Sequence, residues 1–200
     1  MFGATQRRGK AVAKQAKLHS IAAVTRGRRF EGSFDLSGVS YTFHYQPTKA
    51  ALTGRRLELT GNLTVVDGRA SNRAPSHNLP NVRATLISAQ GGIGTAPPRK
   101  KLPPDISAPK PDLPIVESTG ALSFCGVLYF KLAPLEGRAL GVPADMRGLQ
   151  LNVRLAPRDD AEREMQSVFS SIVDSLYGKE LDRDAASAAT GELNKLIATG

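Results

Sequence analysis

The 200-residue chain contains no tryptophan, a single cysteine and only three histidines. With one cysteine, Cys125, the chain cannot form an internal disulfide, and this usage fits a reducing compartment. The apolar neighbours of Cys125 indicate a buried thiol rather than a nucleophile, which would need a nearby base to become a thiolate. The histidines, His19, His44 and His77, are not clustered in the sequence and therefore predict no zinc site.

Long apolar runs are also missing. No stretch approaches the roughly 18–20 apolar residues that a membrane helix needs. The apolar part of the N-terminus, residues 11–24, is interrupted by Lys14, Lys17 and His19, which excludes a secretory signal. We therefore expect a soluble cytoplasmic protein. The mitochondrial matrix is the alternative if the acid-free N-terminus is a presequence.

Catalytic and cofactor motifs with a specific spacing are absent as well. The glycine-rich run 91–94 follows an expected strand, as a phosphate-binding loop would, but Pro97 and Pro98 stand where a helix should begin. The acids at 159–164 are explained by the start of a helix rather than by a metal site or paired catalytic carboxylates. We expect no cofactor and no metal. A ligand-binding or enzymatic β domain whose pocket the sequence hides remains the alternative.

Acidic residues are missing from the first thirty positions of the chain. We call this segment, residues 1–30, the basic head. The basic head carries eight cations: Arg7, Arg8, Lys10, Lys14, Lys17, Arg26, Arg28 and Arg29. From Asp159 onward, nine acids stand against four bases, and residues 31–158 are mildly basic in a chain of net charge +9. This asymmetry predicts either an external anionic partner or contacts between the basic head and the acidic tail.

The basic head allows four interpretations. It can be a solvated or assembly-bound tail, an arm on nucleic-acid phosphates, a presequence, or a contact for an anionic membrane surface. The last is disfavoured because the segment 10–24 has weak amphipathicity and no Trp or Phe. We expect a non-enzymatic binding or structural subunit whose basic head contacts nucleic acid or an acidic protein surface. Arg99, Lys100 and Lys101 form a second group of contacts, and the C-terminal helices offer a surface for assembly or a homo-oligomer.

Alternation of apolar and polar residues predicts an antiparallel hairpin over residues 30–46. Its turn is Ser37-Gly38, and a two-residue loop at this point places Leu36 opposite Val39, both apolar. One face of the second strand then carries three aromatic rings, Tyr41, Phe43 and Tyr45. We expect these rings to be buried in a core. The alternative is a sheet surface on which nucleobases stack.

Further strands are expected over 57–65, 82–86, 119–132 and 149–155. The third of these should be buried on both faces and the last half exposed, while Gly61 marks a bend or bulge. The polar, proline-punctuated residues 69–80 predict a loop. Residues 91–114 contain seven prolines and predict an extended, protease-sensitive loop without regular secondary structure.

Helices are expected at both ends of the chain. Alanine-rich residues 10–24 predict an N-terminal helix with Lys10, Lys14 and Lys17 on one side. Residues 159–177, followed by Gly178 as a C′ residue, predict a C-terminal helix, and 184–198 a weaker one. The expected fold is a mostly β, antiparallel β-sandwich or open barrel of six to seven strands. It divides into a basic arm (1–29), a β domain (30–157) and a helical segment (158–200).

Overall fold

A computed structural model describes residues 16–68, 76–90, 126–178 and 180–199 of the chain. Within them lie nine strands, one 3₁₀ helix and two α-helices. In chain order these are β1 (Ala16–Lys17), β2 (Ser20–Arg26), β3 (Arg29–Leu36), β4 (Val39–Thr53), β5 (Arg56–Asp67), β6 (Ser76–Gln90), β7 (Gly126–Leu132), η1 (Gly137–Leu140), β8 (Ala144–Asp145), β9 (Gln150–Leu155), α1 (Asp160–Tyr177) and α2 (Arg183–Ala198). None of these helices is both long and apolar enough to cross a membrane.

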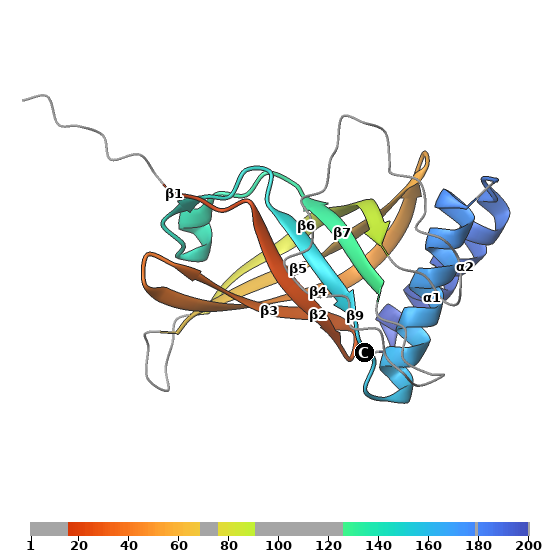
Figure 1. Cartoon of the computed structure of the whole chain (residues 1–200), viewed down its shortest axis with the longest axis horizontal. Helices are drawn as coiled ribbons and strands as arrows, with labels where there is room; N and C mark the ends of the chain where they lie inside the picture. The colour runs from red at the N-terminus through yellow and green to blue at the C-terminus, as the bar shows by residue number, and fades with distance from the viewer. Residues whose placement is uncertain (1–15, 69–75, 91–125, 179, 200) are drawn as a thin grey trace, which may run out of the picture.

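Seven of the strands close into a barrel in the order β2-β3-β4-β5-β6-β7-β9 (Figure 1). Neighbouring strands are antiparallel except β2 and β9, which run parallel and close the sheet. The short strands β1 and β8 pair separately at one end. The expected mostly β fold with C-terminal helices is confirmed, and of the two architectures considered the barrel is the one found, closed rather than open.

The expected 30–46 hairpin is confirmed with its register. Leu36 pairs with Val39, and Ser37 and Gly38 between them have φ angles of 52° and 78°, as a type I′ turn requires. Tyr41 and Phe43 are 1% and 0% exposed, so the aromatic face of β4 lies inside the barrel. The alternative of a nucleobase-stacking surface is therefore wrong for these rings.

Gly61 lies at an irregularity of β5, as expected. The register between β5 and β6 shifts between Gly61 and Leu63. A Cβ built on Gly61 would lie 2.4 Å from the backbone oxygen of Gln46 and 2.9 Å from Cζ of Tyr45. Only glycine allows β4 and β5 to approach this closely.

The expected N-terminal helix is wrong. Ser20–Arg26 forms β2, whose residues alternate between partly exposed and buried, with Ile21 and Ala23 in the core. Alanine propensity favours a helix here by only a few tenths of a kcal/mol per residue. Pairing with both β3 and β9 outweighs it because each pairing supplies ladder hydrogen bonds and apolar burial. The barrel thus includes residues that the sequence pattern placed in the basic arm.

The boundary of one strand and the exposure of another also differ from expectation. Residues 76–80, expected as loop, begin β6, and Pro80 is exposed where the pairing with β5 skips, so its missing N–H breaks no ladder bond. The expectation that the strand over 149–155 is half exposed is wrong as well. Gln150 and Asn152 on its polar face are 8% and 5% exposed, and their amides hydrogen-bond to each other at 2.6 Å, which makes their burial tolerable.

The described part of the strand expected over 119–132 is buried on both faces, as predicted. Leu128 and Phe130 face the barrel interior, while Val127 and Tyr129 belong to a second small apolar cluster with Ile87. Residues 119–125, including Cys125, and the proline-rich segment 91–114 lie outside the described residues.

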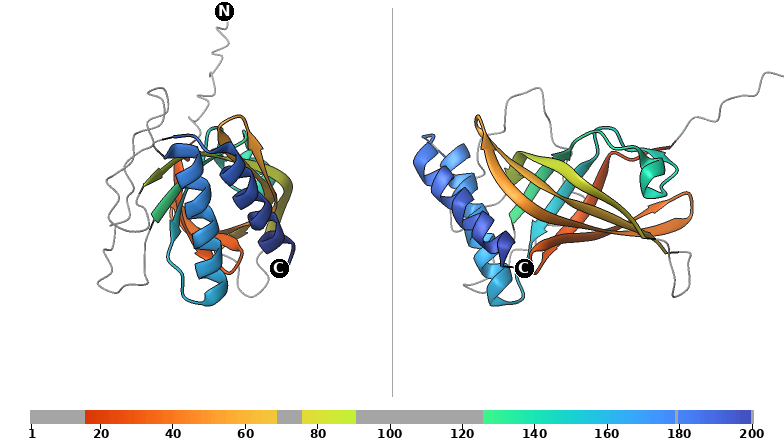
Figure 2. Two further views of the ribbon diagram at one scale, coloured as in Figure 1. Left: turned by 90° about the vertical axis from the view of Figure 1, so that its right-hand side faces the viewer. Right: turned by 180° about the vertical axis from the view of Figure 1, so that it is seen from behind.

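Helix α1 is confirmed, with the Asp159 side chain accepting a hydrogen bond from the backbone N–H of Glu162 at 2.8 Å. The expectation of Gly178 as a C′ residue, typically left-handed, is wrong, because its φ is −64°. Helices α1 and α2 close one end of the barrel (Figure 2). There the Phe169 ring packs 6.1 Å from Phe30 and 6.3 Å from Phe130, between ring centroids.

Helix α2 is attached to the edge of β4. Beyond Tyr45, β4 pairs with no strand of the described residues on its β3 side. There Asn194 of α2 accepts a hydrogen bond from the N–H of Ala50 at 2.7 Å and donates to its carbonyl at 2.9 Å. One side-chain amide thus replaces the backbone of a missing strand and protects an otherwise open edge.

Candidate functional site

Three of the expected anion-contacting residues meet at the turn between β2 and β3. Arg26 ends β2, Arg29 begins β3, and the two are paired across the sheet. Gly27 and Arg28 form the two-residue loop, in which Gly27 has a φ of 55°. A positive φ at the first loop position suits a tight hairpin turn. Three arginines therefore project from the short segment 26–29.

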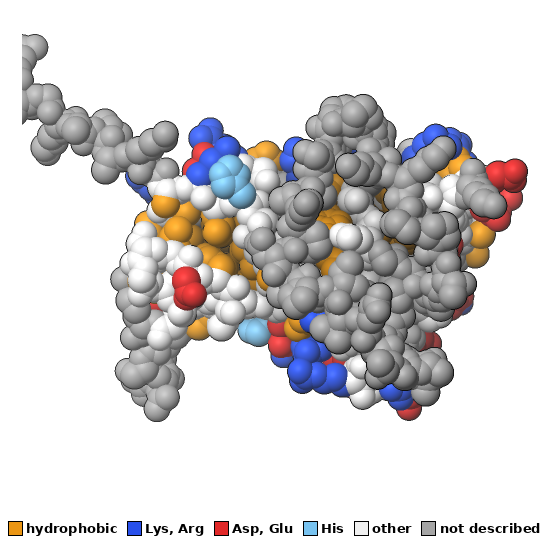
Figure 3. Space-filling model, viewed as in Figure 1, with side chains coloured by type: hydrophobic (Ala, Val, Ile, Leu, Met, Phe, Trp, Pro, Cys, Tyr) orange, Lys and Arg blue, Asp and Glu red, His pale blue; other side chains and the backbone are white. Residues whose placement is uncertain are grey.

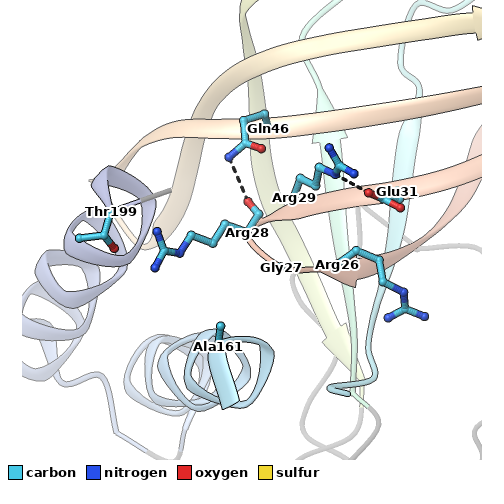
Figure 4. Close-up of a pocket in the computed structure, with 8 residues that line it drawn as sticks. All are labelled: Arg26, Gly27, Arg28, Arg29, Glu31, Gln46, Ala161 and Thr199. Atoms are coloured by element: carbon cyan, nitrogen blue, oxygen red, sulfur yellow. Dashed lines mark hydrogen bonds and ion pairs between the residues drawn. The ribbon is translucent and has the colours of Figure 1, made fainter. Parts of the chain in front are cut away.

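The turn borders an open groove of about 560 Å³ (Figure 4). The groove lies between the β2–β3 turn, the start of α1 and the end of α2. Its lining consists of Arg26, Gly27, Arg28, Arg29, Glu31, Gln46, Ala161 and Thr199. Segments from both ends of the described chain therefore build this site together.

Glu162 of α1 links this helix to the β2–β3 turn. Glu162 is 3% exposed, and its Oε1 accepts a hydrogen bond from the N–H of Gly27 at 2.9 Å. Oε2 accepts from the N–H of Arg158 at 2.8 Å and lies 3.7 Å from Nη1 of Arg26. A carboxylate of the acidic tail thus contacts the basic head within the chain. The sequence predicts Glu162 only as part of a helix cap, three positions after Asp159, and does not indicate its contact with the β2–β3 turn.

Two of the three arginines have partners inside the chain. Arg26 donates to the carbonyls of Thr25 and Ala156, at 2.6 and 3.4 Å, in addition to its ion pair with Glu162. Arg29 forms a hydrogen-bonded ion pair with Glu31. Both guanidinium groups are thereby oriented, and much of their charge is balanced locally.

Arg28 differs from its neighbours. Its carbonyl accepts a hydrogen bond from Nε2 of Gln46 at 3.4 Å, while its side chain points between Thr199 and Ala161 (Figure 4). Within the part of the chain that the structure describes, its guanidinium has no hydrogen-bond or ion-pair partner. Arg28 is thus the cation of this turn that is available to an external anion.

Lys17 lies far from this turn. It is an exposed residue of β1, opposite Asp145 of β8, at the other end of β2 (Figure 1). The carboxylate of Asp145 accepts hydrogen bonds from Nε and Nη2 of Arg147, each at 3.0 Å. These bonds lower the pKa of Asp145 to about 2, assisted more weakly by the charge of Lys17.

The remaining expected contacts cannot be placed. Arg7, Arg8, Lys10 and Lys14 of the basic head, and the second group Arg99, Lys100 and Lys101, lie outside the described residues. Of the eleven expected contacts, the described structure therefore brings together Arg26, Arg28 and Arg29, and it separates Lys17 from them by the length of β2.

Comparison of the sequence with known protein families and curated proteins, and of the fold with solved structures, finds no match. Among the residues that the structure describes, no three His, Cys, Asp or Glu side chains gather as a metal site would require.

Proposed function

We propose that the protein is a non-enzymatic binding subunit whose basic head contacts an anionic partner, with Arg28 as an ordered contact. The observation that carries the proposal is the difference among the three arginines of the β2–β3 turn. Arg26 and Arg29 each have a carboxylate partner, whereas Arg28 has none in the described residues and points into an open groove.

The chemistry of the groove suits a single phosphate or carboxylate group. A guanidinium binds such groups through two parallel hydrogen bonds in a fixed plane. The N–H of Gly27 is already bonded to Glu162, so an incoming anion would bind the Arg28 side chain rather than the backbone of the turn. The carboxylate of Glu31 lines the groove and disfavours anions bound away from Arg28.

A nucleic-acid phosphate backbone is favoured over an acidic protein surface as the partner. Residues 31–158 are themselves net basic, so they add to the attraction of the basic head for a polyanion. The rest of the basic head and the group Arg99, Lys100 and Lys101 would supply further phosphate contacts. An acidic protein surface remains the second candidate, and it is separable by experiment.

The alternative of a pocket deep inside the barrel receives less support from the described core. The barrel interior is filled with aromatic rings: the centroid of Phe30 lies 5.9 Å from that of Tyr45 and 5.5 Å from that of Phe130. All three side chains are at most 1% exposed. A filled interior together with a free surface cation is the arrangement expected of a binding module.

The test is binding of a fluorescent single-stranded DNA oligonucleotide by the full chain, by Arg28→Ala and by Arg138→Ala. Arg138 is exposed in η1, far from the helix-capped end, so its replacement removes the same charge elsewhere. We expect Arg28→Ala to weaken binding about tenfold, the effect of one charge-assisted hydrogen-bonded contact, and Arg138→Ala less than about twofold.

A polyglutamate peptide of equal charge serves as the second ligand. Tighter binding to polyglutamate than to DNA would replace nucleic acid with an acidic protein surface as the partner. Equal binding by all three proteins, or no binding of either ligand at low salt, would overturn the proposal.

A further inference from the structure

The barrel is built differently at the end away from the helices. Strand β2 pairs with β3 only from Ala23 with Gly32 to Arg26 with Arg29. Residues 33–36 of β3 therefore have a strand partner only in β4. Likewise, β7 pairs with β6 only from Ala84 onward. At this end β3, β4, β5 and β6 continue as an open four-stranded sheet, and the segment containing η1 and β8 lies across it (Figure 1).

The inner face of this open sheet is apolar and incompletely covered. Four apolar residues that pack on the core here are only partly buried, and together with Tyr41 we call them the barrel mouth: Leu18, Phe34, Leu36 and Leu79. The facing segment contributes Leu140, Val142 and Met146, which are buried. Figure 3 shows apolar side chains uncovered at this end of the molecule. An uncovered apolar surface at a barrel mouth is a common location for ligand binding.

The hydroxyl of Tyr41 is the unusual polar group of the barrel mouth. Tyr41 is 1% exposed, and its ring stacks on Phe34 with centroids 5.1 Å apart and planes at 12°. Its hydroxyl is inaccessible to solvent and has no hydrogen-bond partner among the residues that the structure describes. By contrast, the hydroxyl of Tyr45, two residues along the same face, lies 2.9 Å from the carbonyl of Val82 and 3.2 Å from that of Leu59. A buried hydroxyl without a partner is unfavourable, so each such group calls for an explanation, and a bound molecule that supplies the acceptor is one.

We propose that the barrel mouth binds an uncharged, apolar small molecule whose carbonyl oxygen accepts a hydrogen bond from the Tyr41 hydroxyl. The apolar residues supply the walls, and the partly exposed ring of Phe34 supplies a flat surface for stacking. The ligand is uncharged because the residues of the barrel mouth, four aliphatic or aromatic side chains and a neutral tyrosine, offer no group that would pair with a charged head group.

Access requires movement of one strand end only. Phe34 is partly buried and stacks on the Tyr41 ring, and residues 33–36 pair with a described strand on one side alone, β4. Displacing this end breaks few backbone hydrogen bonds and leaves the seven-strand closure near Ala23 intact. The ligand carbonyl then reaches the hydroxyl from the side of Phe34.

The probe is prodan, a neutral naphthyl ketone whose emission shifts to longer wavelength when its carbonyl accepts a hydrogen bond. We expect saturable binding of prodan by the full-length protein. It should be displaced by 2-acetylnaphthalene at about fivefold lower concentration than by 2-ethylnaphthalene, because the two differ only in the carbonyl and one neutral hydrogen bond is worth that factor. The anion 2-naphthoate should compete less well than 2-acetylnaphthalene.

Tyr41→Phe should abolish the fivefold preference and move the emission of bound prodan to shorter wavelength. The variant should fold, because it removes only the unpartnered hydroxyl. Tyr45→Phe is the matched control: it removes a hydroxyl that already has partners and should leave the preference unchanged. Absence of saturable prodan binding, or an unchanged preference in Tyr41→Phe, would overturn the inference. Neither result depends on Arg28 at the opposite end of the barrel.

Discussion

Oε1 of Glu162 accepts a hydrogen bond from the N–H of Gly27, 2.9 Å away and 135 positions earlier in the chain. This contact ties the first turn of α1 to the β2–β3 turn that carries Arg26, Arg28 and Arg29. Glu162 is buried, so this hydrogen bond is shielded from competing water and is correspondingly strong. The position of Arg28 in the groove therefore depends on a carboxylate of the acidic tail.

Replacing Glu162 should destabilise the whole chain. Glu162→Ala leaves the N–H groups of Gly27 and Arg158 without their acceptor and Arg26 without its carboxylate. We expect the free energy of unfolding to fall by about 2–4 kcal/mol, measured by urea denaturation. Glu164→Ala, on an exposed position of the same helix, should change it by less than about 0.5 kcal/mol. Equal effects of the two substitutions would show that Glu162 is not a structural link.

The attachment of α2 to the edge of β4 gives a second prediction. Asn194→Ala removes both hydrogen bonds to Ala50 and should lower the free energy of unfolding by about 1–3 kcal/mol. Amide exchange at Ala50 should become faster because its N–H loses its acceptor. Ser187→Ala, on an exposed position of α2, is the control and should have little effect. Unchanged exchange at Ala50 in Asn194→Ala would contradict this account.

Two glycines predict effects of opposite sign for the same substitution. Gly61→Ala would place a Cβ 2.4 Å from the Gln46 carbonyl oxygen, and we expect a loss of about 1–3 kcal/mol or more of unfolding free energy. The Cβ added by Gly191→Ala in α2 would meet no atom within 4 Å, and we expect the free energy of unfolding to rise by about 1 kcal/mol. Thermal or urea unfolding of both variants tests the pair. A stable Gly61→Ala would show that β4 and β5 are further apart there.

The ion pair at β8 predicts a defined pH dependence. Hydrogen bonds from Arg147 lower the pKa of Asp145 from 3.8 to about 2 in the folded chain. A lowered pKa stabilises the fold above the unfolded value, and that contribution is lost as pH falls from about 4 to about 2. The stability difference between the native chain and Asp145→Asn should therefore be constant above pH 5 and shrink over this window. A difference that does not change with pH would contradict the assignment.

Local patterns in the sequence predicted the parts of the fold whose partners are near in the chain. The 30–46 hairpin followed from the alternation on both sides of Ser37-Gly38, and α1 followed from its cap and apolar stripe. Strand β2 was missed because its alanines favour a helix locally, while the strand is stabilised by β9, more than 120 residues away. Its Thr25 hydroxyl, for example, donates to the carbonyl of Arg154 across 129 positions.

The candidate site could be predicted in composition but not in arrangement. The clustering of cations in the sequence identified Arg26, Arg28 and Arg29, but it did not indicate which of them would form ion pairs. That distinction depends on Glu162, which contacts the turn from 135 positions away in the chain, and on Glu31, which follows Arg29 by two residues. The unpartnered hydroxyl of Tyr41 could not be predicted either, because strand alternation places a ring in the core without indicating which groups surround its hydroxyl.

The most direct test of the central claim is the salt dependence of DNA binding by the full chain and by Arg28→Ala. If Arg28 contacts a phosphate, removing it should lower the slope of log affinity against log salt concentration by about one, since one fewer counterion is released on binding. Arg138→Ala should leave the slope of the native chain unchanged. Identical slopes for Arg28→Ala and the native chain would show that Arg28 does not contact a phosphate and would contradict the proposed function.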